Sequence, residues 1–160
     1  MSDKDDVDLS ILKQPLPSTN EFDGLQYRLM GFATGLALLV ALAPTWFVRD
    51  RDTSRIFDLY SGTSLFGFAP DKDAPLGPLG IVLVLVYVAL ALSLLVAPAE
   101  SAYGLVAGIA GLAVTLVIVV AGKALSDYDD MSWTGAPFIA LGIWVVAVLV
   151  SIAARSADRS

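Results

Sequence analysis

Hydrophobic residues in this chain gather into four long stretches separated by polar segments. None of the four has a charged residue in its interior, and they cover residues 29–48, 76–96, 102–121 and 137–154. Each is about as long as the roughly 20 residues that an α-helix needs to cross ~30 Å of hydrocarbon. Because a bilayer offers the backbone no water, each stretch must satisfy its amides internally, as a helix. The pattern predicts an all-α integral membrane protein, a four-helix antiparallel bundle with one longer outer loop.

The polar segments set the expected domain organisation. Residues 1–27 form an acidic arm containing Pro15 and Pro17, residues 28–154 form the membrane domain, and residues 155–160 form a short tail. Five residues separate the second stretch from the third, so these two helices must form an antiparallel hairpin. The longer outer loop covers residues 49–75, and a shorter loop on the same side covers residues 122–136.

Small residues recur at helical spacing in the first and third stretches. Such small-xxx-small patterns let two helix backbones approach each other closely in a membrane. The pattern predicts two helix-packing faces, either inside the bundle or against a partner, with the closest backbone approach expected in the third stretch. The glycines concerned are Gly31 and Gly35 in the first stretch and Gly104, Gly108 and Gly111 in the third.

The longer outer loop carries an apolar cluster that is unusual for a solvated loop. We expect this cluster to lie on the membrane surface or to pack against another protein. Buried aromatic side chains tend to dominate protein interfaces, so the loop is the predicted partner contact. The residues expected to make it are Phe57, Tyr60, Leu65, Phe66 and Phe68.

Composition argues against catalysis and against most cofactors. The chain has no cysteine and no histidine, which excludes thiolate chemistry, haem ligation by histidine and the usual zinc and copper sites. The hydroxyls in the stretches have no base near them in sequence, so we expect them to bond to their own or a neighbouring helix. Transport sites usually need ionisable groups at membrane depth, and the stretches have none. The sequence therefore predicts no enzyme, no catalytic residue, no cofactor and no metal site.

The distribution of charged residues does not by itself determine which way the chain is oriented in the membrane. An even number of crossings puts both termini on one side, and each side then carries five Lys or Arg residues, so the positive-inside rule ties. We expect cytoplasmic termini, because the acidic arm has no visible means of crossing first. The net charge of −6 and the acidic arm argue against nucleic acid as a partner.

Two short motifs carry a resemblance to a known class of protein. They are Pro44-Thr45-Trp46 at the end of the first stretch, and the Tyr60–Gly67 segment YSGTSLFG before a Val- and Leu-rich hairpin. With its Ala-, Val-, Asp- and Gly-rich composition, the chain resembles the small four-span membrane proteins of actinobacteria. Some of these are accessory subunits of the respiratory supercomplex that joins a cytochrome bcc complex to an aa3 oxidase, and others form a tryptophan-operon-associated group of unknown role.

The resemblance implies a non-catalytic accessory subunit of a bacterial plasma membrane complex. Its partners would be other integral membrane subunits and membrane lipids, and it offers no catalytic residue to carry over. Two alternatives remain open at this point: a free-standing four-span envelope protein that forms homo-oligomers, and a small component of a transporter or channel.

Overall fold

The computed structural model describes residues 19–51, 56–63, 77–96, 102–124 and 131–157. Three of its helices contain segments long and apolar enough to cross a membrane, namely Leu79–Val96, Ala102–Ala121 and Ala136–Ala157. This is the composition expected of a membrane protein. In chain order the elements are α1 (Thr19–Val40), β1 (Thr45–Arg51), β2 (Ile56–Ser61), α2 (Gly77–Val96), α3 (Ala102–Ala124), β3 (Met131–Trp133) and α4 (Ala136–Ala157).

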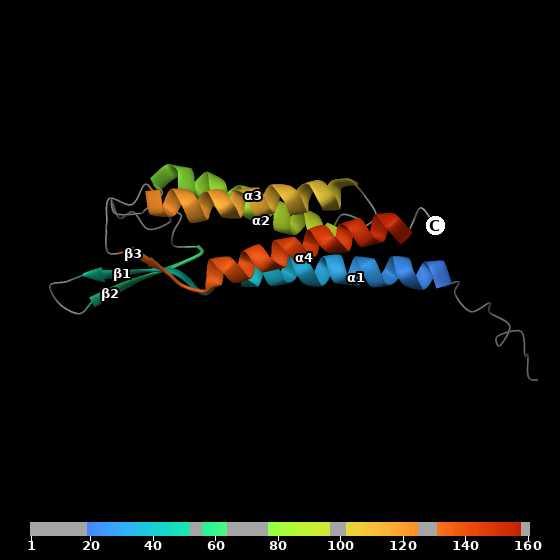
Figure 1. Cartoon of the computed structure of the whole chain (residues 1–160), viewed down its shortest axis with the longest axis horizontal. Helices are drawn as coiled ribbons and strands as arrows, with labels where there is room; N and C mark the ends of the chain where they lie inside the picture. The colour runs from blue at the N-terminus through green and yellow to red at the C-terminus, as the bar shows by residue number, and fades with distance from the viewer. Residues whose placement is uncertain (1–18, 52–55, 64–76, 97–101, 125–130, 158–160) are drawn as a thin grey trace, which may run out of the picture.

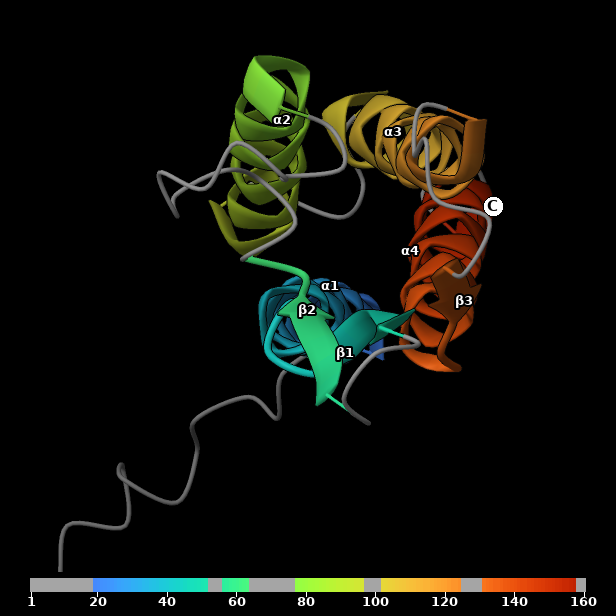
Figure 2. The same ribbon diagram turned by 90° about the vertical axis from the view of Figure 1, so that its left-hand side faces the viewer.

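The four helices lie side by side, and each contacts two others. α1 packs against α2 and α4, and α3 packs against the same two helices (Figure 2). Consecutive helices run in opposite directions, so α1 begins and α4 ends at one end of the molecule, which we call the terminal side (Figure 1). The strands lie at the other end, which we call the sheet side. Large apolar side chains cover the outward surfaces of all four helices.

The first helix differs from the prediction at both of its ends. The stretch 29–48 was expected to be one helix, but α1 begins at Thr19, ends at Val40, and is followed by β1 from Thr45. Proline at position 44 disfavours helical backbone at the residue before it. The run Trp46-Phe47-Val48 then consists of aromatic and β-branched residues, which favour a strand. The other three helices lie within three residues of the predicted ends.

The two segments expected to be loops contribute strands, so the fold is mostly helical but is not all-α. β1 and β2 come from residues 45–61, and β3 comes from the connection between α3 and α4. They form one antiparallel sheet with the order β2-β1-β3. Directly opposite residues include Tyr60, Phe47 and Trp133 across the three strands. β3 has only three residues, and an alternating hydrophobic pattern cannot predict a strand this short.

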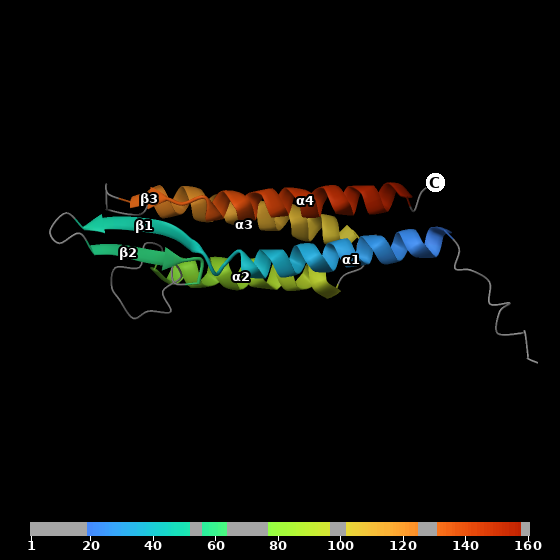
Figure 3. The same cartoon turned by 90° about the horizontal axis from the view of Figure 1, so that it is seen from below.

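The sheet continues outward from where α1 stops, beside the middle of α2 (Figures 1 and 3). The Tyr87 hydroxyl donates a hydrogen bond to the Leu38 carbonyl oxygen at 3.1 Å, and Tyr87 is the eleventh of the 20 residues of α2. Near the terminal side, one small cavity is lined by Gly31 of α1, Leu94 of α2 and Gly104 of α3. Gly31 is therefore level with the ends of α2 and α3, and the 12 residues before it extend about 18 Å further.

Candidate functional site at the sheet base

The backbone leaves α1 through a hydrogen-bonded turn. The Ala41 amide donates to the Ala37 carbonyl at 2.9 Å, the Leu42 amide to Leu39 at 3.3 Å, and the Ala43 amide to Val40 at 3.0 Å. These bonds tighten the end of the helix and satisfy carbonyls that would otherwise lack a donor. The turn connects α1 to the first residues of β1. We define the sheet base as residues 45–48 together with residues 60–62.

Three buried aromatic rings fill the space beyond the end of α1, and we call Trp46, Tyr87 and Trp144 the aromatic cluster. Trp46 and Tyr87 meet edge to face with ring centroids 6.3 Å apart, and Tyr87 and Trp144 do so at 5.4 Å. The Trp46 indole N–H donates to the Ala41 carbonyl oxygen at 2.8 Å. Edge-to-face geometry at these distances is favourable for aromatic pairs. The cluster thus ties β1 to α1, α2 and α4 at one level.

Trp144 is accommodated by a glycine on the facing helix. A Cβ atom on Gly111 would lie 2.3–2.4 Å from three ring carbons of Trp144, so no larger residue fits without moving the ring. The Trp144 indole N–H lies toward the Tyr87 hydroxyl. It is outside hydrogen-bonding geometry and has no acceptor among the described residues. Packing against Tyr87 and Gly111 is therefore what positions Trp144.

Thr134 joins β1 to the start of α4. Its backbone amide donates to the Trp46 carbonyl at 3.0 Å, and its hydroxyl lies within hydrogen-bonding distance of the Thr45 and Trp46 carbonyls. The same hydroxyl accepts from the Ala136 amide at 3.2 Å, which satisfies a donor in the first turn of α4. The Thr134 side chain therefore both holds β1 in place and caps the first turn of α4.

Gly62 closes the sheet base on the β2 side. Its amide donates to the Pro44 carbonyl at 3.3 Å. A Cβ atom here would lie 2.7 Å from the Leu42 carbonyl oxygen and 2.8 Å from its Cα, so the position requires glycine. Nothing in the sequence alone shows that the chain returns to the end of α1 at this glycine.

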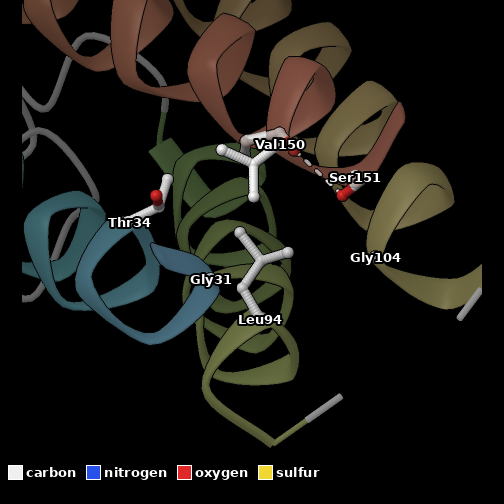
Figure 4. A pocket seen from close by; sticks show the side chains of 7 residues that line it. Gly31, Thr34, Leu94, Gly104, Val150 and Ser151 are labelled. Carbon is white, nitrogen blue, oxygen red and sulfur yellow. Dashed lines mark hydrogen bonds between the residues drawn. The ribbon is translucent and has the colours of Figure 1, made fainter. Parts of the chain in front are cut away.

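The predicted helix-packing glycines face other helices of the same chain. A Cβ atom on Gly35 would lie 2.9 Å from the Ala91 carbonyl oxygen, and one on Gly108 would lie 2.9 Å from Cγ2 of Val148. Gly31 and Gly104 help to line the cavity near the terminal side, whose volume of about 10 Å³ has room for at most one water molecule (Figure 4). The other residues that line it are Thr34, Leu94, Ala147, Val150 and Ser151.

The serine and threonine hydroxyls in the apolar parts of the four helices bond to the backbone. Each of four serine and threonine side chains donates to a carbonyl three or four residues earlier in its own helix, at 2.7–2.9 Å. Such back-bonding is the usual state of hydroxyls in membrane helices. No cluster of acidic side chains able to hold a metal ion occurs in the ranges that the structure describes. The four side chains are Thr34, Ser93, Thr115 and Ser151.

The predicted partner contact is only partly visible. Phe57 and Tyr60 belong to β2, where backbone pairing sets them opposite Asp50 and Phe47. Leu65, Phe66 and Phe68 lie outside the described residues. Leu59, which the sequence did not single out for this role, is 64% exposed on the sheet. On β1, Phe47 is buried and its ring packs on Trp133 with centroids 3.8 Å apart.

Comparison with family models, with curated proteins and with solved structures finds no match to this chain.

Proposed function

We propose that the chain crosses a bacterial plasma membrane four times, with a first crossing that is half helix and half strand. α2, with 20 residues, is about 30 Å long and matches the hydrocarbon thickness. α1 ends beside its middle, so about 15 Å remains to be crossed. Extended residues 45–48 cover about 13 Å at 3.3 Å each. The charged run that begins at Arg49 then falls at the membrane surface.

Non-helical backbone is tolerated at membrane depth only where protein covers it and its polar groups are bonded. Both conditions support this arrangement. Trp46 and Phe47 are fully or almost fully buried. The carbonyls of Pro44, Thr45 and Trp46 accept hydrogen bonds from Gly62 and Thr134. The four crossings would form an antiparallel bundle with both termini in the cytoplasm, the sheet base within the membrane, and the outer part of the sheet, from Arg49, beyond the opposite membrane surface.

Within this topology we propose a non-catalytic accessory subunit of a larger membrane complex. The observation that carries the proposal is the attachment of the sheet to the helices through the aromatic cluster, Thr134 and Gly62. A sheet held this firmly presents the exposed Leu59 in a fixed orientation, as a preorganised partner surface should. The hydroxyls of Thr34, Ser93, Thr115 and Ser151 bond within their own helices, which suits a structural role.

The respiratory bcc–aa3 supercomplex is the assembly that the sequence resemblance favours. Both motifs that carry the resemblance overlap the sheet base. Pro44 to Trp46 connect α1 to β1, and Tyr60 to Gly62 form the end of β2 and the turn after it. The assignment is thus a proposal about the same part of the molecule that the structure singles out.

Gentle detergent extraction followed by native electrophoresis and mass spectrometry of the bands tests this proposal. An accessory subunit should be recovered with cytochrome-bearing subunits at fixed stoichiometry. Migration alone or as a homo-oligomer would contradict it and favour a free-standing envelope protein.

Variants of the sheet locate the contact. Leu59→Asp, and separately Phe66→Ser with Phe68→Ser, should release the protein from its complex while leaving it inserted in the membrane. Thr63→Asp, a charge at another exposed position beside the sheet, is the matched control and should leave the complex intact. Full co-purification of the Leu59 and Phe66/Phe68 variants would show that the sheet side is not the anchor.

A further inference from the structure

The terminal side of α1 carries an apolar surface at an unusual depth. Gly31 is level with the ends of α2 and α3, and α1 extends beyond those ends toward the terminal side (Figures 1 and 3). If α2 spans the hydrocarbon, the residues that precede Gly31 lie outside it. Lipid tails therefore do not reach most of this part of α1.

An open groove of about 460 Å³ lies on this extension. Leu25 is 56% exposed and lies about 9 Å beyond Gly31, outside the proposed hydrocarbon layer, and Leu29 is 61% exposed and lies about 3 Å beyond Gly31, at the edge of that layer. Contiguous apolar surface outside the membrane is normally covered by protein. The groove is lined by Leu25, Gln26, Leu29, Met30 and Ala33.

We propose that the groove is covered by the chain's own N-terminal arm, through Leu9, Ile11 and Leu12. Among residues 1–18, the part of the arm that precedes α1, these three are the apolar side chains nearest to the helix apart from Leu16, which lies between Pro15 and Pro17. Residues 1–18 lie outside the described part of the structure and directly precede α1, so this is the part of the chain tethered closest to the groove. The proposal concerns the terminal side and does not depend on whether the sheet binds a partner.

Chain length allows this contact. Leu12 is seven residues before Thr19, and an extended chain of that length reaches about 24 Å. Leu29 lies ten residues into α1, about 15 Å along its axis. The two prolines between Leu12 and Thr19 oppose continuation of the helix, which leaves the arm able to turn back. A tether this short gives an effective concentration on the order of millimolar, far above that of an untethered partner.

Cysteine chemistry tests the proposal cleanly, because the native chain has no cysteine. In one variant Ile11→Cys is combined with Met30→Cys, which lies in the groove. In the matched control Ile11→Cys is combined with Arg28→Cys, which is exposed on α1 but does not line the groove. Both are oxidised in broken native membranes, and the intrachain disulfide is scored by the loss of maleimide labelling.

The groove pair should form the intrachain disulfide several-fold faster than the control pair. Equal rates would show an arm that does not prefer the groove, and an interchain disulfide would show that a second copy supplies the occupant. Either result overturns the proposal.

A second measurement separates the arm from lipid as the cover. Met30→Cys alone should react slowly with a water-soluble maleimide, and replacing Leu9, Ile11 and Leu12 by Ser should speed that reaction several-fold. Arg28→Cys should react equally fast in both backgrounds. Slow labelling of Met30→Cys that the serine substitutions leave unchanged would mean that lipid or another protein covers the groove, and would overturn the proposal.

Discussion

The two halves of this molecule solve one packing problem in different ways. On the terminal side four helices meet through small residues, with Gly31, Gly35 and Gly104 at the contacts and a cavity of about 10 Å³ between them. On the sheet side α1 is missing, and large aromatic rings fill the wider space between three helices and a sheet. Small residues suit close helix pairs. Where a helix stops, bulky side chains must replace it.

The difference also shows in how polar groups are used. On the terminal side, Thr34 and Ser151 bond back to their own helices and join nothing together. On the sheet side, Tyr87 and Thr134 bond to residues 49 and 89 positions away in the sequence, and Trp46 bonds back across the turn that follows α1. We therefore expect stability to depend strongly on the sheet side and weakly on the terminal side.

The largest effect should come from Trp46→Ala. This change removes a buried ring from the aromatic cluster and leaves the Ala41 carbonyl without its donor. We expect a loss of about 3–5 kcal/mol of unfolding free energy, measured by SDS titration in mild-detergent micelles. Leu149→Ala, at an exposed position on α4, should cost much less, because lipid or detergent replaces the lost contacts. Equal losses of unfolding free energy for the two variants would contradict the expectation that stability depends mainly on the sheet side.

A smaller loss is expected when the space beside Trp144 is filled. Gly111→Ala places a methyl group against the ring, and overpacking of this kind costs about 1–3 kcal/mol. Gly142→Ala on α4 is the matched control, because its Cβ would meet nothing within 4 Å. It should leave stability unchanged or raise it slightly, since alanine favours a helix over glycine. The same titration separates the two outcomes, and a Gly111→Ala protein as stable as the native chain would show that Trp144 is loosely held.

The smallest losses of stability should come from removing single hydroxyl groups. One such change in each half of the molecule compares the two halves directly. Thr134→Val keeps the shape of the side chain but loses its bonds to the sheet and to Ala136, and should cost about 1–2 kcal/mol. Ser151→Ala removes only a bond within one helix and should cost less than about 1 kcal/mol. Thermal unfolding of both in the same detergent tests this order. The reverse order would mean that Thr134 does not join the sheet to α4.

Sequence reasoning reached the helical part of this fold and missed the sheet. Apolar stretches of about 20 residues are a strong signal, and they located α2, α3 and α4 to within three residues. The same rule assigned residues 45–48 to a helix, because apolar content alone does not distinguish a helix from a buried strand. Pro44 and the aromatic and β-branched residues after it favour a strand instead of a helix. The sequence alone does not show that this preference prevails, and the packing of Trp46 on Tyr87 does.

The site was predicted less well than the helices, for a physical reason. Glycine spacing can be read within one helix, so positions such as Gly108 and Gly111 were visible in the sequence. The roles of Thr134 and Gly62 depend on chain segments that meet only in the folded protein, between residues up to 89 positions apart. No local pattern carries that information. The predicted contact residues Leu65, Phe66 and Phe68 remain a prediction.

Our central claim is that the first crossing changes from helix to strand near mid-membrane, and a disulfide tests it most directly. Val48 and Ser132 are directly opposite in the pairing of β1 with β3, so Val48→Cys with Ser132→Cys should form an intrachain disulfide in native membranes. Leu59→Cys with Ser132→Cys should not, because β1 lies between their strands and separates them by about 9–10 Å. Failure of the first pair to cross-link, with a helix continuing through Val48, would contradict the claim.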